Sequence, residues 1–230
     1  MKTLAVIPAR GGSKRIPRKN VRQFLDKPII SYSISAALKA NIFDEVMVST
    51  KDPEIADISK MFGAQIPFLR SAETSDDYST ISDVLGEVLA QYETLGKFFE
   101  NICVIYPTAP LITAERIKQG FNLLCGNNHD AVFYVVKFSY PIQRALTLDG
   151  GKLSFIHPEN VDTRSQDLKA AYHDAGQLFW ITRQAFFRQR SVFVDNIGAV
   201  ELPEREAQDI DTEEDWEMAE LKYRLLVKGK

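Results

Sequence analysis

Cysteine is scarce in this chain of 230 residues. The sequence therefore lacks the disulfide pattern of a small secreted protein and the ligand pattern of a domain held together by a metal. The only two cysteines are Cys103 and Cys125, and no group of cysteines and histidines has the spacing of a zinc site. A disulfide framework is therefore excluded. Because both cysteines fall in apolar segments, we expect two buried thiols.

Long apolar runs and an excess of one charge are also missing. No stretch approaches the ~18 to 20 apolar residues that span a bilayer, and the N-terminus lacks a secretory signal pattern. The 28 basic and 31 acidic residues give a net charge of −3, which does not suggest a nucleic-acid binder. We therefore expect a cytoplasmic, soluble protein with neither a membrane nor a nucleic acid as partner.

The apolar residues form short segments that alternate with longer ones. The short, β-branched segments have the nearly continuous apolar character of strands covered on both faces; they are residues 3–9, 45–50, 101–107 and 131–136. Apolar residues at three- and four-residue spacing predict helices over 28–40, 52–63, 79–96 and 113–126. The alternation predicts an α/β fold with a doubly wound, mostly parallel sheet.

The second predicted helix has clear boundary signals. Asp52 is a candidate N-cap, Pro53 suits the first helical position, and Gly63 suits the end. These residues predict a helix that occupies most of 52–63.

The alternation breaks after about residue 137. Residues 144–156 alternate apolar and polar side chains around an Asp-Gly-Gly turn, which predicts a β-hairpin. Because a single hairpin is marginally stable in water, we expect it to lie on the parent domain or on a second subunit. Strand character returns at 175–183 and 197–203, and 211–226 is a predicted terminal helix.

A basic, glycine-containing loop leaves the first predicted strand. It combines Gly11 and Gly12 with six cationic side chains: Arg10, Lys14, Arg15, Arg18, Lys19 and Arg22. Ligands of open α/β sheets sit beyond the carboxyl ends of the strands, and this mixture of backbone N–H groups and positive charge suits a polyphosphate. The pattern is neither a Walker A loop nor a dinucleotide-binding turn, and the alternative is a solvated basic loop.

Motifs along the whole chain are similar to those of one family. The loop sequence IPARGGSKRIPRKN is followed by VSTKDPEIADISKMFGAQIPFLR, YPTAPL, RSQDL, YHDAGQLFW and DIDTEEDWEMAE. Together they resemble the acylneuraminate cytidylyltransferases, the CMP-sugar synthetases of sialic acids and related nine-carbon acids. The last four motifs look most like the branch that acts on pseudaminic acid.

This resemblance implies a fold and a reaction. The fold would be a Rossmann-like single domain over 1–230, of the nucleotide-diphospho-sugar transferase type, in which 138–170 form a β-hairpin insert for dimerisation and substrate binding. The protein would be a homodimer that converts CTP and a nonulosonic acid into a CMP-sugar and pyrophosphate, for surface glycan or flagellin glycosylation. Positioning and neutralisation of phosphate charge would supply most of the catalysis.

The resemblance also assigns nucleotide contacts. Residues at the family's triphosphate and nucleotide positions are Ala9, Arg10, Gly11, Gly12, Lys14, Lys19 and Asn20. Arg70, Asp77 and Thr80 fall on the segment around the cytidine. Arg10 and Lys19 are expected to be catalytic.

Asp209 and Asp211 are candidate metal ligands. Their two-residue spacing turns both carboxylates the same way on extended backbone, although Asp211 followed by Glu214 also fits an N-cap of the terminal helix. The resemblance places Mg²⁺ on this pair, and sharing carboxylates with substrate phosphates is typical of that ion. We expect both aspartates to be catalytic through Mg²⁺, with Asp211 also able to cap the helix.

The sugar site would draw on residues around the hairpin. Arg164 suits a bidentate pair with the sugar carboxylate, and Gln166, His173 and Asp174 suit its hydroxyl and amide groups. Tyr106 stands where sialic-acid enzymes commonly carry Gln, and suits a less hydroxylated sugar. For His173 and Tyr106 the alternative is an ordinary surface or core side chain.

Other functions remain open from the sequence. The sugar could be N-acetylneuraminic, legionaminic or 3-deoxy-manno-octulosonic acid. A catalytically silent nucleotide-binding protein could share the fold. A glycosyltransferase is a third alternative, although its Asp-x-Asp would be expected in mid-chain.

Overall fold

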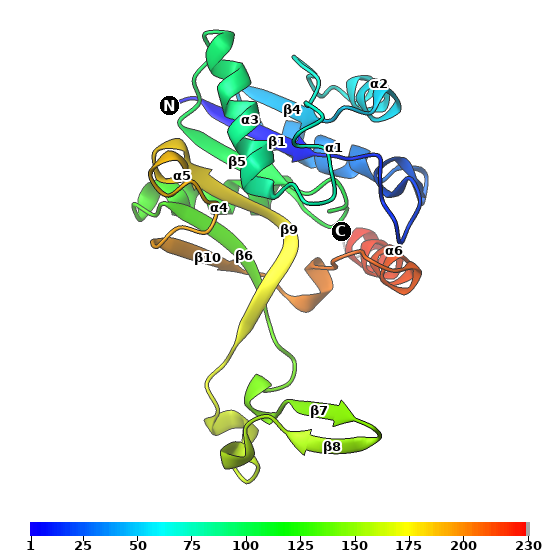
Figure 1. The fold of residues 1–230 in the computed structure, drawn as a ribbon, viewed down its shortest axis with the longest axis vertical. Coiled ribbons are helices and arrows are strands. Elements are labelled where there is room, and N and C mark those ends of the chain that lie inside the picture. The colour runs from blue at the N-terminus through cyan, green and yellow to red at the C-terminus, as the bar shows by residue number, and fades with distance from the viewer. Residues whose placement is uncertain (229–230) are drawn as a thin grey trace.

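A six-stranded mixed sheet forms the centre of the computed structural model, which describes residues 1–228 (Figure 1). The strands, in the order in which they lie, are β10 (Ile197–Glu201), β6 (Ala131–Lys137), β9 (Tyr172–Thr182), β5 (Asn101–Ile105), β1 (Thr3–Pro8) and β4 (Glu45–Ser49). β9 is antiparallel to β5 and β6, and the other neighbours are parallel. The predicted α/β class and mostly parallel sheet are confirmed.

Helices cover both faces of this sheet. One core cluster contains residues of α1 (Ile30–Ala40), α2 (Pro53–Met61) and α4 (Ala114–Gly126), and a second contains residues of α3 (Ile81–Thr94) and α5 (Arg183–Gln189). Within β1, Ala5 and Ile7 face the first cluster while Leu4 and Val6 face the second. Successive side chains of a strand point to opposite faces, which explains why this strand is apolar throughout.

Boundary signals in the sequence agree with the structure at α2. The Asp52 side chain accepts a hydrogen bond from the Ile55 N–H at 3.1 Å, and Pro53 is the first helical residue. Gly63 has a φ of +93°, the left-handed conformation that favours glycine after a helix. The predicted cap, start and end are therefore confirmed.

One cysteine prediction is wrong. Cys103 on β5 is buried as expected, but Cys125 in the last turn of α4 is exposed. Its neighbour Leu124 is only 2% exposed and occupies the core-facing side. Consecutive helical residues differ in direction by about 100°, so one apolar segment gives one buried and one exposed side chain.

A third apolar cluster joins the two ends of the chain. Ile16 and Phe24, from the loop and short hairpin after β1, pack with Ile210 and with Trp216 of α6 (Glu213–Lys228). The hairpin consists of β2 (Gln23–Phe24) and β3 (Lys27–Pro28), which the sequence analysis did not predict. The rings of Phe24 and Trp216 meet edge to face with centroids 5.5 Å apart. This cluster fixes the basic loop against the C-terminal segment.

Residues 138–171 form an arm that projects from the sheet (Figure 1). It contains the predicted hairpin, observed as β7 (Leu146–Asp149) and β8 (Lys152–Phe155). Within residues 1–228 these strands pair only with each other, and Leu148 and Leu153, which lie opposite one another, are 70% and 61% exposed. Of the two expected supports for the hairpin, its own domain is therefore excluded. No helix in this described part of the chain is long and apolar enough to cross a membrane.

Candidate functional site

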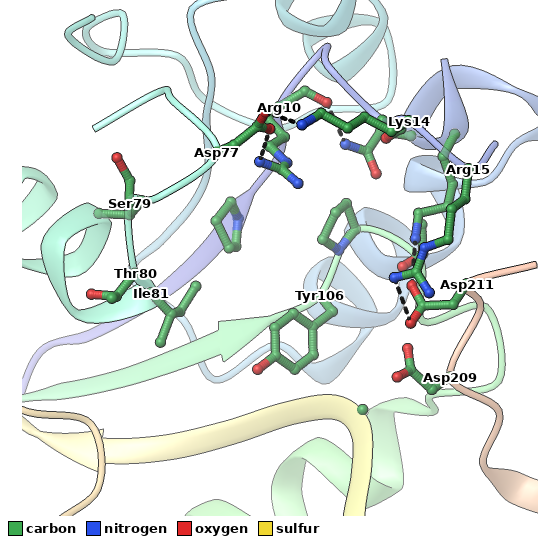
Figure 2. A pocket seen from close by; sticks show the side chains of 18 of the residues that line it. Arg10, Lys14, Arg15, Asp77, Ser79, Thr80, Ile81, Tyr106, Asp209 and Asp211 are labelled. Carbon is green, nitrogen blue, oxygen red and sulfur yellow. Dashed lines mark hydrogen bonds and ion pairs between the residues drawn. The ribbon is translucent and has the colours of Figure 1, made fainter. Parts of the chain in front are cut away.

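A cavity of about 880 Å³ opens beyond the carboxyl ends of β1 and β5 (Figure 2). The loop after β1, the segment 70–84, the end of β5 and the Asp209–Asp211 segment all contribute to its lining. In Figure 2, Ser79, Thr80 and Ile81 lie on one side, Arg15 and Asp211 lie on the other, and Tyr106 stands between them. This is the position at which open α/β sheets bind ligands.

The six cations of the basic loop divide into two groups. Four of them line the cavity: Arg10, Lys14, Arg15 and Lys19. Arg18 instead binds Asp52, with Nη1 2.5 Å from Oδ2, and also pairs with Glu54. Arg22 binds Glu213 at 2.6 Å and lies over the Trp216 ring at 4.5 Å. The expectation that all six cations serve one anion is wrong, because two of them fasten the loop to its neighbours.

The four cations that line the cavity contact two aspartates. Arg10 Nη1 and Lys14 Nζ lie 2.8 Å and 2.5 Å from the Asp77 carboxylate. Arg15 lies 3.0 Å from Asp211, and Lys19 Nζ lies 3.5 Å from Asp211 and donates to the Ile210 carbonyl at 2.6 Å. The cavity therefore carries both positive and negative side chains, and these four positive side chains all come from one loop.

The small residues of the loop have other roles than lining the cavity. Among the described residues, Ala9, Gly11 and Gly12 are outside its lining. A Cβ on Gly11 would lie 2.3 Å from Asp52 Oδ2, so glycine is needed for the approach of α2, and Gly12 faces open space. Asn20 does line the cavity; it is buried and donates from Nδ2 to the Arg10 carbonyl at 2.8 Å, which holds the loop closed.

Arg70 and Thr80 line the cavity from the segment before α3. Arg70 is 8% exposed and donates from Nε to Ser49 Oγ at 3.0 Å, and burial lowers the pKa of its guanidinium to about 10. Thr80 caps α3 through reciprocal hydrogen bonds with Asp83. Both residues are therefore held rigidly at the edge of the cavity.

The two candidate metal ligands lie together at the opposite side. The pKa of Asp209 is raised, mainly because burial removes water from its carboxylate and secondly because the negative charge of Asp211 lies nearby. Gly176 permits this placement: its φ is +65°, and a Cβ there would lie 3.1 Å from the Asp209 side chain. In residues 1–228 no cluster of three or more carboxylate, His or Cys groups is arranged for a metal, so a bound ion would depend on other oxygens as well.

Asp211 does not cap α6, contrary to one sequence interpretation. Thr212 is the cap: the Asp215 N–H donates to Thr212 Oγ1 at 3.2 Å, and the Thr212 N–H donates to Asp215 Oδ2 at 2.8 Å. The capping box is displaced by one residue from the predicted Asp211–Glu214 pair. The Asp211 carboxylate is thus left to face Arg15 and Lys19.

A second cavity of about 400 Å³ adjoins the first, and Asp174, Asp209 and Asp211 line both. His173 lines the second cavity, where its ring lies 4.9 Å from that of Phe138. Desolvation raises the pKa of Asp174. Tyr106 lines the first cavity, and desolvation raises its pKa to about 12. The structure therefore brings three of the five predicted sugar contacts to these cavities.

The other two predicted sugar contacts lie elsewhere. Arg164 and Gln166 are exposed residues of the arm, and neither of these described residues lines either of the two cavities. Within one chain, the predicted sugar contacts are therefore divided between the cavities and the arm.

Phe193 is a cavity residue that the sequence analysis missed. It is 71% exposed although its neighbours Val192 and Val194 are 1% and 5% exposed in the second core cluster. This alternation turns Phe193 toward the cavity, where it stacks on Phe133 with ring centroids 5.7 Å apart. With Ile81 and Val84 it gives the cavity an apolar end. The Val-Phe-Val pattern was the available signal.

Comparisons with known proteins agree with this architecture. Residues 4–219 match the protein family described as Cytidylyltransferase. The chain is 40% identical to the pseudaminic acid cytidylyltransferase of Campylobacter jejuni over 98% of this chain and 97% of that protein. It is 30% identical to the CMP-N,N'-diacetyllegionaminic acid synthase of Legionella pneumophila, over 96% and 95% of the two chains. A structure of CMP:2-keto-3-deoxy-manno-octonic acid synthetase complexed with CTP shares the fold, with a TM-score of 0.73, 17% identity and 100% coverage of both chains.

The two residues at the start of α6 can be separated by substitution. Thr212→Ala should lower the free energy of unfolding by about 1 kcal/mol because it removes a helix cap. Asp211→Ala, which removes a 41% exposed carboxylate, should cost no more than about 0.5 kcal/mol. Urea unfolding of both variants measures the difference, and a larger loss for Asp211→Ala would contradict the assignment of the cap.

Proposed function

Since the chain belongs to the cytidylyltransferase family, we propose that it transfers CMP from CTP to the anomeric hydroxyl of a nonulosonic acid, pseudaminic acid in the first place. The observation that carries this proposal is the convergence of four cations of the basic loop and the Asp209–Asp211 pair in one cavity at the strand ends. The similarity to pseudaminic acid cytidylyltransferases over nearly the whole chain supports the choice of sugar.

The cations suit the triphosphate of CTP. In the proposed reaction the anomeric oxygen forms a bond to the α-phosphorus, and the bond from that phosphorus to the bridging oxygen of pyrophosphate breaks. Negative charge accumulates on the departing pyrophosphate, and Arg10, Lys14, Arg15 and Lys19 are placed to neutralise it. Arg70 and Thr80, from the segment before α3, would hold the cytidine.

Asp209 and Asp211 are proposed to hold Mg²⁺. Two carboxylates that share a cavity with a polyphosphate fit this ion, because Mg²⁺ prefers oxygen ligands and commonly completes its shell with phosphate and water. The raised pKa of Asp209 also fits, since a cation would relieve the repulsion between the two carboxylates. When bound, the ion would supply further neutralisation of phosphate charge.

Asp174 is proposed to accept the proton of the attacking hydroxyl. It lies between the two cavities, where the sugar and the α-phosphate would meet. Its raised pKa makes it a stronger base than an ordinary aspartate. His173 and Tyr106 would contact the remaining groups of the sugar, and Phe193 supplies an apolar surface at the other end of the first cavity.

The arm is proposed to complete the site of a second subunit in a homodimer. Its apolar face, which includes the opposed pairs Leu146–Phe155 and Leu148–Leu153, is exposed in the single chain. A two-fold contact would cover that face and could carry Arg164 and Gln166 to the partner's sugar site. This explains how two arm residues can serve a cavity that they do not line in their own chain.

The proposed compartment is the cytoplasm. Cys103 and Cys125 are both free thiols, and free thiols are typical of a reducing compartment. The main alternative function is the same reaction on another ulosonic acid, because the similar Legionella pneumophila protein is named for a diacetyllegionaminic acid product.

Removal of either carboxylate tests the metal site. Asp209→Asn or Asp211→Asn should lower the turnover of CTP by about 100-fold or more, because phosphate charge would be left unneutralised. Pyrophosphate release with a nonulosonic acid, with and without chelator, is the assay, and circular dichroism checks the fold. Wild-type turnover that persists in excess chelator would refute the metal requirement.

Mixed dimers test the role of the arm. Lys19→Ala and Arg164→Ala should each be nearly inactive, whereas a mixture that exchanges subunits should recover up to about a quarter of wild-type activity, because half of the dimers would contain one intact composite site. Two inactive variants that fail to complement after exchange, shown by differently tagged subunits, would place Arg164 outside the partner's site.

A further inference from the structure

The acidic strap, residues 71–80 before α3, reaches across the cavity to the basic loop. Asp77 bridges Arg10 and Lys14 through separate carboxylate oxygens, at 2.8 Å and 2.5 Å (Figure 2). Arg10 also donates to the Asp76 carbonyl at 3.4 Å. Two of the four cations assigned to the triphosphate therefore share one carboxylate of the strap.

The strap is a rigid turn that presents this carboxylate. Asp76 Oδ1 accepts hydrogen bonds from the Ser79 N–H at 2.7 Å and the Tyr78 N–H at 3.0 Å, so Asp76 points into the turn while Asp77 points out of it. Glu87 of α3 fastens the start of the strap by accepting from the Ser71 N–H at 2.7 Å and from the Thr74 hydroxyl. Asp77 is thus held beside the cations at a high local concentration.

A phosphate group and the Asp77 carboxylate would compete for Arg10 and Lys14. Both anions are attracted to the same two cationic groups, and they would repel each other if both remained. We propose that Asp77 is a tethered competitor that sets how tightly anions are held in the phosphate site. This inference rests on the proposed function, because it takes the four cations to be the triphosphate site.

CTP and pyrophosphate must both displace the same carboxylate. CTP offsets that cost with further contacts through its nucleoside, near Arg70 and Thr80. Pyrophosphate has only the cations to hold it, so the same cost leaves it weakly bound. Asp77 therefore favours release of pyrophosphate.

Asp77→Asn tests this role, with inorganic pyrophosphate as the probe. Its dissociation constant, measured by calorimetry, and its inhibition constant against CTP should both fall by about threefold, as expected for the loss of a partly exposed ionic competitor. The dissociation constant of CTP should fall by a similar factor, because CTP displaces the same carboxylate, and kcat should fall if pyrophosphate release limits turnover. Asp77→Glu should retain wild-type pyrophosphate affinity.

Glu73→Gln is the matched control. Glu73 is an exposed residue of the same strap, and among the described residues it forms no ion pair with the four cations. The substitution therefore removes one negative charge from the strap without removing a contact to Arg10 or Lys14. Equal tightening in this variant would overturn the proposal by showing a general charge effect. Unchanged or weaker pyrophosphate binding by Asp77→Asn would overturn it as well. If Asp77→Asn does not fold, Asp77→Ser provides the same comparison.

The wild-type protein separates this inference from the function on which it rests. If it binds neither pyrophosphate nor CTP, the proposed function itself fails. If it binds both and Asp77→Asn does not tighten pyrophosphate, only the role of Asp77 fails.

Discussion

The packing of the basic loop against the C-terminal helix is the constraint on which the site depends. Ile16 and Phe24 enter one apolar cluster with Trp216, and Lys19 donates to the Ile210 carbonyl beside the Asp209–Asp211 segment. Segments about 190 residues apart in sequence thereby place cations and carboxylates around one cavity. Because the contact is largely apolar, its packing can hold side chains of like charge near one another, although they would otherwise move apart into solvent.

Much of the fold could be predicted because the sheet follows simple periodicity. The nearly continuous apolar segments became strands buried on both faces, and the hairpin over 144–156 was visible as alternation around its Asp-Gly-Gly turn. The short β2–β3 hairpin was missed because two-residue strands leave no measurable period. The exposure of Cys125 was missed because helical direction changes between adjacent residues, and composition alone does not record it.

The site was predictable as a set of residues more than as a geometry. The positive charge of the basic loop indicated an anion site. Arg18 and Arg22, however, form ion pairs with Asp52 and Glu213, and these partners are distant in sequence. Spacing alone also favoured Asp211 as the N-cap of α6, whereas the observed N-cap is the next residue, Thr212. Long-range partners and one-residue shifts are properties of packing, and a local pattern does not contain them.

The central claim is that this cavity joins CMP to a nonulosonic acid. Its most direct measurement is the formation of CMP-sugar from CTP, in Mg²⁺, with purified pseudaminic, legionaminic, N-acetylneuraminic and 3-deoxy-manno-octulosonic acids. The account predicts the highest kcat/KM with pseudaminic acid and stoichiometric release of pyrophosphate. Higher kcat/KM with another of these acids would contradict the choice of sugar, and no CMP-sugar from any of them by the folded protein would contradict the account as a whole.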